Sequence, residues 1–119
     1  MGLTSQVSIR SYPEPLRSLD YTGISGAYAL IGSGLVWPSR ILKFTNTTNV
    51  SVTISWDGTN DHDIIPPNSF CLYDFSTNKI VEQGWFATGG QRFYVKGTST
   101  NPSSGSVYVT TFFGLSEGG

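Results

Sequence analysis

The clearest pattern in the chain is a strict alternation of apolar and polar residues over residues 50–56. An alternation with a period of two predicts a half-buried β-strand, because successive side chains of a strand point to opposite faces. We expect the apolar set to face the core and the hydroxyl residues between its members to face water. The inward set comprises Val50, Val52, Ile54 and Trp56, and the outward set comprises Ser51, Thr53 and Ser55.

Further segments are rich in β-branched and aromatic residues and are bounded by turn residues, which is the pattern of strands. We expect strands at 40–45, 63–68, 69–75, 91–97 and 106–113. Prolines end the segment 63–68 and confine it to the edge of a sheet. The segment 69–75 has apolar residues on both faces and is expected to be interior to a sandwich or covered by a neighbour.

The first third of the chain lacks this regularity. Two prolines in the segment 11–17 remove backbone donors and force extended geometry, so this segment is neither a helix nor a central strand. Glycines interrupt the residues that follow, where 27–31 is the one candidate for a short strand. We therefore expect residues 1–36 to form an extended N-terminal arm with at most short strands, and residues 37–119 to form a β-sandwich domain.

Length and composition agree with an all-β protein of one domain. The chain has 119 residues, enough for a single core. Charged residues make up 13% of it, and it contains three Glu, three Lys and three Ala, so the residues that favour helices are scarce. Because strands follow one another with short turns and no helical pattern between them, we expect a single antiparallel β-sandwich or a jelly-roll-like domain.

Charge and hydropathy argue against nucleic-acid and membrane partners. The formal net charge is −1, and the seven cationic residues are spread along the whole chain, whereas phosphate binding requires clustered Lys or Arg. No apolar run approaches the length of a membrane span. The first residues lack the basic start and apolar core of a secretory signal, so we expect the protein to be made in the cytoplasm.

One polar cluster, the stretch 57–63, contains three aspartates and the only histidine of the chain. Three carboxylates close together suggest a site for a hard cation or a general base. The spacing matches neither a helix-flanked calcium loop nor a zinc site, which requires more His or Cys. Asp-Gly and Asn-Asp pairs are typical of hairpin connections, because they tolerate positive φ and bond to their own backbone. We therefore expect a turn here and assign no metal ligand.

The chain also lacks a recognisable catalytic constellation. His62 has no second histidine to work with, and there is no nucleophile elbow and no phosphate-binding glycine loop. Cys71 lies in an apolar run, where we expect it to be a small buried residue and therefore an unreactive thiol. These features predict a protein that is not an enzyme and has no cofactor.

Aromatic residues are the remaining candidates for function. Trp56 is in phase with the apolar set of its strand and is expected in the core. The pairs Trp85-Phe86 and Phe112-Phe113 each place one ring on each face of an extended chain, so at least one ring is expected at an interface. Trp37 precedes a proline and is expected to pack locally. Exposed aromatic rings also stack on sugars, so one functional hypothesis is a carbohydrate-binding module.

Several segments together resemble small structural proteins of tailed-bacteriophage virions. The resemblance lies in the strand and turn at 40–48, the aromatic-Asp-Gly-x-Asn-Asp turn within 55–62, the Phe-x-Leu-x-Asp strand at 70–75, the Tyr-Val-Lys-Gly strand at 92–97 and the strand at 105–109. These segments lie between residues 40 and 109. The resemblance implies a capsid- or neck-associated β-sandwich without enzymatic activity, located in the virion.

Within that resemblance we expect a head decoration (cement) protein that binds and stabilises the capsid lattice. The alternative is a head–tail connector or a subunit that attaches a tail or fibre. The expected partners are the major capsid protein or other virion proteins, together with further copies of the chain. An arm rich in Pro and Gly gains structure when it lies on a neighbour. The expected contact residues are Tyr12, Pro13, Pro15, Leu16, Arg17, Tyr21, Trp85 and Phe86.

Overall fold

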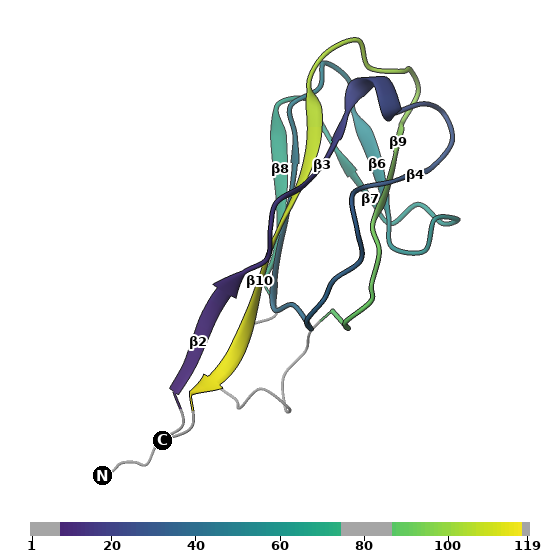
Figure 1. Cartoon of the computed structure of the whole chain (residues 1–119). Helices are drawn as coiled ribbons and strands as arrows, with labels where there is room; N and C mark the ends of the chain where they lie inside the picture. The colour runs from purple at the N-terminus through teal and green to yellow at the C-terminus, as the bar shows by residue number, and fades with distance from the viewer. Residues whose placement is uncertain (1–7, 75–86, 118–119) are drawn as a thin grey trace.

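The computed structural model describes residues 8–74 and 87–117 and shows two antiparallel β-sheets packed face to face (Figure 1), which confirms the predicted all-β sandwich. The five-stranded sheet has the order β2-β10-β5-β8, with β3 also paired to β10, and the four-stranded sheet has the order β4-β9-β6-β7. The bounds of the elements are β2 Ser8–Pro13, β3 Arg17–Asp20, the 3₁₀ turn η1 Tyr21–Gly23, β4 Ala29–Leu30, β5 Ile41–Asn46, β6 Val52–Ser55, β7 Asp63–Ile65, β8 Ser69–Asp74, β9 Tyr94–Gly97 and β10 Ser106–Glu117.

Strand β10 organises the five-stranded sheet because it uses both of its edges. On one edge it pairs with β5, from Val107 opposite Asn46 to Phe112 opposite Ile41. On the other edge β3 pairs with its first residues and β2 with its last ones. Strand β2 ends at Pro13, and Pro15 lies between β2 and β3; neither proline can donate a hydrogen bond to a ladder. The predicted last strand is present and extends four residues beyond its expected end.

Beyond the sandwich, β2 and β10 continue together as a two-stranded ribbon, defined here as β2 with residues 112–117 of β10. The pairing of β5 with β10 ends at Ile41 opposite Phe112, whereas the pairing of β2 with β10 runs on to Glu117. The ribbon therefore projects from one end of the sandwich (Figure 1). The molecule is correspondingly elongated, with extents of 57 × 24 × 19 Å.

The core lies between the two sheets and is built from aliphatic and aromatic residues of both. Phe44 of β5 and Phe93 just before β9 are fully buried, and their rings meet edge to face at 5.2 Å. Trp56 packs against Phe93 in the same way at 5.1 Å, so its predicted place at the core is confirmed. Edge-to-face ring pairs add about 0.5 to 1.5 kcal/mol each beyond the area they bury.

The hydroxyl residues of β6 differ from expectation. Thr53 and Ser55 were predicted to face water, but both are buried, so that prediction is wrong. The Thr53 hydroxyl bonds to that of Thr98 at 2.9 Å, and the Ser55 hydroxyl donates to Asp57 at 2.9 Å. The segments that carry Thr98 and Asp57 thus lie against β6. Their hydrogen bonds replace those that the two hydroxyl groups would otherwise form with water.

Strand β8 also differs from expectation. It was predicted to be interior to a sandwich or covered by a neighbour, but its side chains alternate between half-buried and exposed, and Phe70 and Leu72 lie on the exposed face. The interior position is wrong, because β8 lies at the edge of the five-stranded sheet among the described residues. Coverage by a neighbouring molecule stays a prediction.

The stretch expected to form an extended arm, residues 1–36, is described from Ser8 onward. It provides β2, β3 and η1, and the predicted short strand within 27–31 is present as β4, which pairs with β9. Ile24, Ile31 and Leu35 are buried in the core. This part of the chain thus contributes strands to both sheets and side chains to the core.

Candidate functional site

An exposed apolar surface lies where the ribbon leaves the sandwich. We call it the ribbon-base patch, and it consists of Tyr12, Leu16, Val36, Trp37 and Phe113. The side chains of Leu16, Val36 and Trp37 are 60%, 72% and 46% exposed. Leu16 and Val36 line one surface pocket together with Pro15. Large apolar side chains gathered on a surface mark interaction sites in soluble proteins.

The aromatic part of the ribbon-base patch is a stack of three rings. Tyr12 of β2 lies opposite Phe113 of β10 in the strand register, and their ring centres are 5.6 Å apart. Trp37 stacks on Phe113 at 5.4 Å, with an angle of 15° between the rings. Pro38 favours an extended conformation for Trp37, the residue before it. The stack therefore holds the segment that carries Trp37 against the ribbon.

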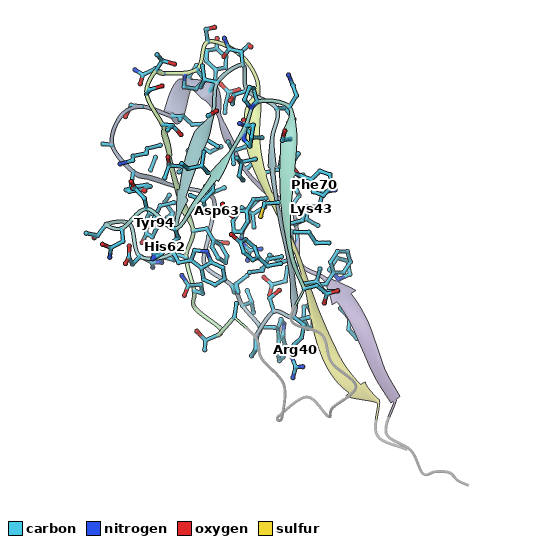
Figure 2. All side chains as sticks on the ribbon, turned by 180° about the vertical axis from the view of Figure 1, so that it is seen from behind. Arg40, Lys43, His62, Asp63, Phe70 and Tyr94 are labelled. Carbon is cyan, nitrogen blue, oxygen red and sulfur yellow. The ribbon has the colours of Figure 1, made fainter. Side chains whose placement is uncertain are left out.

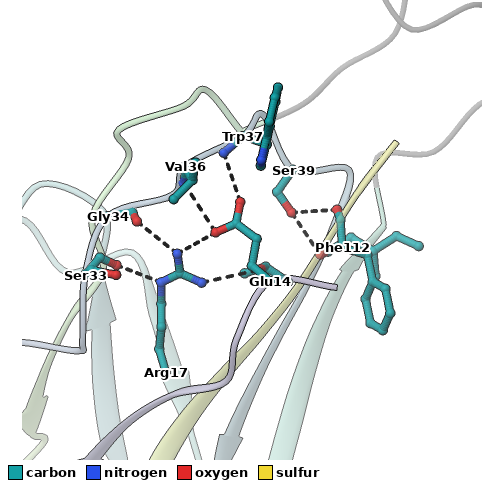
Figure 3. A network of polar contacts seen from close by, with 10 residues as sticks. Glu14, Arg17, Ser33, Gly34, Val36, Trp37, Ser39 and Phe112 are labelled. Carbon is teal, nitrogen blue, oxygen red and sulfur yellow. Dashed lines mark hydrogen bonds and ion pairs between the residues drawn. The ribbon is translucent and has the colours of Figure 1, made fainter. Parts of the chain in front are cut away.

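A buried ion pair lies beneath the ribbon-base patch (Figure 3). Nη2 of Arg17 is 2.6 Å from Oε1 of Glu14, and the two side chains are only 5% and 3% exposed. Arg17 further donates to the carbonyl oxygens of Ser33 at 2.7 Å and Gly34 at 2.9 Å, and to the Thr111 hydroxyl at 3.3 Å. One guanidinium thus joins the loop before β3, the 33–34 segment and β10.

Glu14 makes the corresponding contacts on the other side of the pair. Its Oε2 accepts from the backbone N–H of Trp37 at 2.9 Å, and its Oε1 accepts from that of Val36 at 3.3 Å. Burial tends to raise the pKa of Glu14, but the hydrogen bonds from Arg17 and from these two N–H groups outweigh it and hold the pKa below its ordinary value. The pair thus fixes the backbone of Val36 and Trp37, two of the exposed residues of the patch.

The lowered pKa of Glu14 predicts a pH-dependent contribution to stability. A carboxyl with a depressed folded-state pKa stabilises the fold above its unfolded-state pKa, here near the ordinary 4.5, and loses that contribution as pH falls through the folded-state value. Glu14→Gln is expected to lower the free energy of unfolding by about 1 to 3 kcal/mol at neutral pH. In urea unfolding, this difference from the unmodified chain should shrink on acidification. A difference that does not change with pH would contradict the role of the carboxylate.

Four of the predicted contact residues lie at or beside the ribbon-base patch. Tyr12 and Leu16 belong to it, and Pro13 and Pro15 are exposed next to them. They come together because the ribbon ends at Pro13 and the chain then turns around the buried Glu14 to enter β3. Contact with a partner remains a prediction for all four.

The structure does not bring the other four predicted contact residues to this surface. Arg17 is buried in the ion pair, where it positions the patch from beneath. Tyr21 lies in η1, at the end of the sandwich opposite the ribbon (Figure 1). Trp85 and Phe86 lie outside the described residues.

Sequence reasoning missed Glu14 and Val36 and expected only local packing for Trp37. A signal for Trp37 was present in the sequence, because a residue before a proline favours an extended conformation, which exposes its side chain. Arg17 follows Glu14 by three positions in an irregular segment, so no periodicity in the sequence indicated that the two form a buried pair.

Residues 57–62 of the acidic stretch lie in the connection between β6 and β7, as its turn residues predicted, and Asp63 begins β7. Oδ1 of Asp57 accepts from the backbone N–H groups of Thr59 and Asn60, each at 2.8 Å. These contacts, with that of the Asn60 backbone the largest, hold the pKa of Asp57 well below its ordinary value. The carboxylate therefore acts as the acceptor that closes the turn.

The other two carboxylates of this stretch point to different partners. Asp61 lies 3.3 Å from the ammonium of Lys96 and accepts from the Tyr28 hydroxyl. Asp63 accepts from the Tyr73 hydroxyl of β8 and so links the two sheets. Across residues 8–74 and 87–117, no group of three or more His, Cys, Asp or Glu is placed to hold a metal ion.

In the comparisons with known proteins, no protein-family model, no curated protein and no solved structure matched this chain. Within the described ranges, no helix has the length and apolar character needed to cross a membrane.

Proposed function

We propose that this chain is a non-enzymatic structural protein of a tailed-bacteriophage virion, a head decoration protein that binds the major capsid protein and stabilises the capsid lattice. The observation that carries the proposal is the ribbon-base patch, where exposed apolar side chains are held on a rigid, hydrogen-bonded support. The reason for proposing a virion as the place where this chain acts is the sequence resemblance over residues 40–109.

The ribbon supports a role in binding other proteins. A two-stranded ribbon is marginally stable in water by itself, and its unpaired strand edges are ready to pair with another chain. Among the described residues, the outer edge of β2 has no neighbouring strand, and β10 has none on its β5 side after Phe112. A strand of a partner protein can add to either edge through main-chain hydrogen bonds.

The ion pair supports the same role through preorganisation. Surfaces that are rigid before binding lose less conformational entropy when they bind. Trp37 and Val36 are exposed side chains on a backbone that Glu14 fixes at two consecutive N–H groups. The patch thus has the character of a protein-binding surface, because it combines stacked aromatic rings with exposed aliphatic side chains.

The proposal is tested by removing apolar area from the patch without adding charge near the ion pair. In the Leu16→Gln, Val36→Gln double variant, we expect the number of copies incorporated into virions to fall at least about tenfold, which corresponds to about 1.4 kcal/mol of binding free energy. Incorporation is measured by quantitative gel analysis of virions assembled with the variant chain.

The matched control is the Leu30→Gln, Ile64→Gln double variant, which removes two exposed aliphatic side chains from the four-stranded sheet. We expect it to be incorporated normally. Equal incorporation of both double variants, each folded as judged by circular dichroism, would contradict the proposal. Copies per virion also separate a decoration protein, which follows the number of capsid subunits, from a head–tail or fibre-attachment subunit, which forms only a small ring.

A further inference from the structure

The outer face of β8 carries a second apolar surface, which shares no residue with the ribbon-base patch. Phe70 and Leu72 point away from the sandwich and are 62% and 53% exposed. Nζ of Lys43, on the neighbouring strand β5, lies 5.0 Å from the centre of the Phe70 ring (Figure 2). These three residues form what we call the β8 surface.

Strand β8 is also an edge strand that lacks the usual protection. Among the described residues, its one neighbour within the sheet is β5. Natural proteins block such edges with charged residues, prolines or bulges, because an unpaired edge recruits other strands. Residues 69–73 contain no charge and no proline, and their register with β5 is continuous, which leaves no bulge.

The sequence of β8 is complementary to itself in one antiparallel register. Opposite residues of an antiparallel pair share a face, and a slip by one residue turns every side chain over. With Phe70 of one copy opposite Leu72 of the other, the four exposed apolar side chains meet on one face. The neighbouring permitted registers are poorer, since one places Phe70 opposite Asp74 and the other places Leu72 opposite Asn68, whose φ of 56° lies outside the strand.

We propose that two copies of this chain pair through β8, antiparallel and about a two-fold axis at Cys71, with Phe70 of each copy opposite Leu72 of the other. The two five-stranded sheets then join into one continuous sheet through main-chain hydrogen bonds between the two β8 strands. Because the same surface is used on both copies, the contact closes on itself and produces a dimer. Residues 69–73 bring no like charges together across the axis.

This register places the only cysteine of the chain opposite its own copy. Cβ atoms of directly opposed residues lie about 4.5 to 5.5 Å apart, close to the separation of about 3.5 to 4.5 Å found in disulfides. Cys71 is half-buried and its Sγ lies 3.1 Å from Oδ2 of Asp63. Burial raises the pKa of the Cys71 thiol, so oxidation needs a catalyst such as copper phenanthroline at mildly alkaline pH.

The first test is sedimentation velocity of the full chain from about 1 to 100 μM, the range in which interfaces of moderate affinity dissociate. We expect a concentration-dependent dimer. Leu72→Glu, which places a carboxylate opposite Phe70 of the other copy, should raise the dissociation constant at least about tenfold. Ile64→Glu is the matched control, because Ile64 is 56% exposed on β7, and it should leave the dissociation constant unchanged.

The second test is catalysed oxidation of the unmodified chain, which should yield a covalent dimer on a non-reducing gel. Cys71→Ser should abolish the covalent product and keep the dimer in sedimentation. If Leu72→Glu fails to fold by circular dichroism, Leu72→Thr removes the apolar contact while keeping a strand-favouring residue and should also weaken the dimer.

A chain that stays monomeric over this range would overturn the proposal. So would a dimer that Leu72→Glu or Leu72→Thr does not weaken, or a dimer without a Cys71 crosslink. The inference does not depend on the proposed function, because neither Leu16 nor Val36 takes part in it. Normal virion incorporation of the Leu16→Gln, Val36→Gln variant would therefore leave the dimer untouched.

Discussion

Replacing Arg17 with methionine is expected to lower the free energy of unfolding by about 3 to 5 kcal/mol, a large part of the stability of a domain of this size. The loss arises because Glu14 would remain buried without a compensating charge, and two backbone carbonyl groups and the Thr111 hydroxyl would lose their donor. Methionine keeps most of the volume of the arginine stem, so the change isolates the charge and its hydrogen bonds. Urea unfolding at neutral pH measures the effect.

Arg92→Met is the matched control, because Arg92 is exposed and its removal should change stability by no more than about 0.5 kcal/mol. Adding Glu14→Gln to Arg17→Met should recover part of the loss, since no uncompensated charge then remains in the interior. If Arg17→Met and Arg92→Met were equally stable, the ion pair could not be a main support of the ribbon-base patch.

Gly105→Ala is expected to be nearly as damaging for a different reason. Gly105 precedes β10 with φ of +86°, a conformation that costs a residue with a Cβ about 1 to 2 kcal/mol. A Cβ there would also lie 2.2 Å from the carbonyl oxygen of Thr47, so the backbone would have to move, at a further cost of about 1 to 3 kcal/mol. We expect a total near 3 kcal/mol, measured by chemical denaturation.

Gly26→Ala provides the comparison for this glycine. A Cβ at Gly26 would meet nothing within 4 Å, so the substitution should be neutral or slightly stabilising. An unchanged unfolding midpoint for Gly105→Ala would show that the turn before β10 can shift at little cost.

The strands were predictable from sequence where apolar and polar residues alternate, or where β-branched and aromatic residues lie between turn residues. The alternation of Val52 and Ile54 located β6 and its inward face correctly. It did not reveal that Thr53 and Ser55 are buried too, because their partners, Thr98 and the turn at Asp57, come from other parts of the chain. The sequence does not indicate whether a hydroxyl group forms its hydrogen bonds with water or with other groups of the protein.

The same limit applies to the candidate sites. Tyr12 and Leu16 could be singled out because prolines hold the segment around them extended. The apolar run of β8 was equally visible, but whether a third layer covers Phe70 and Leu72 depends on where the rest of the chain goes. The buried ion pair was the hardest feature to foresee, since Arg17 finds its acceptors in Ser33 and Gly34, sixteen and seventeen residues away.

The shared strand β10 has a mechanical consequence. Hydrogen bonds between antiparallel strands run perpendicular to the strand direction. A pull on the ribbon along its axis therefore loads the bonds of β10 with β5 and with β3 in shear, all at the same time, rather than opening them one by one. The ribbon is thus attached to the sandwich in the orientation that resists traction best, and a force applied to it spreads across the five-stranded sheet.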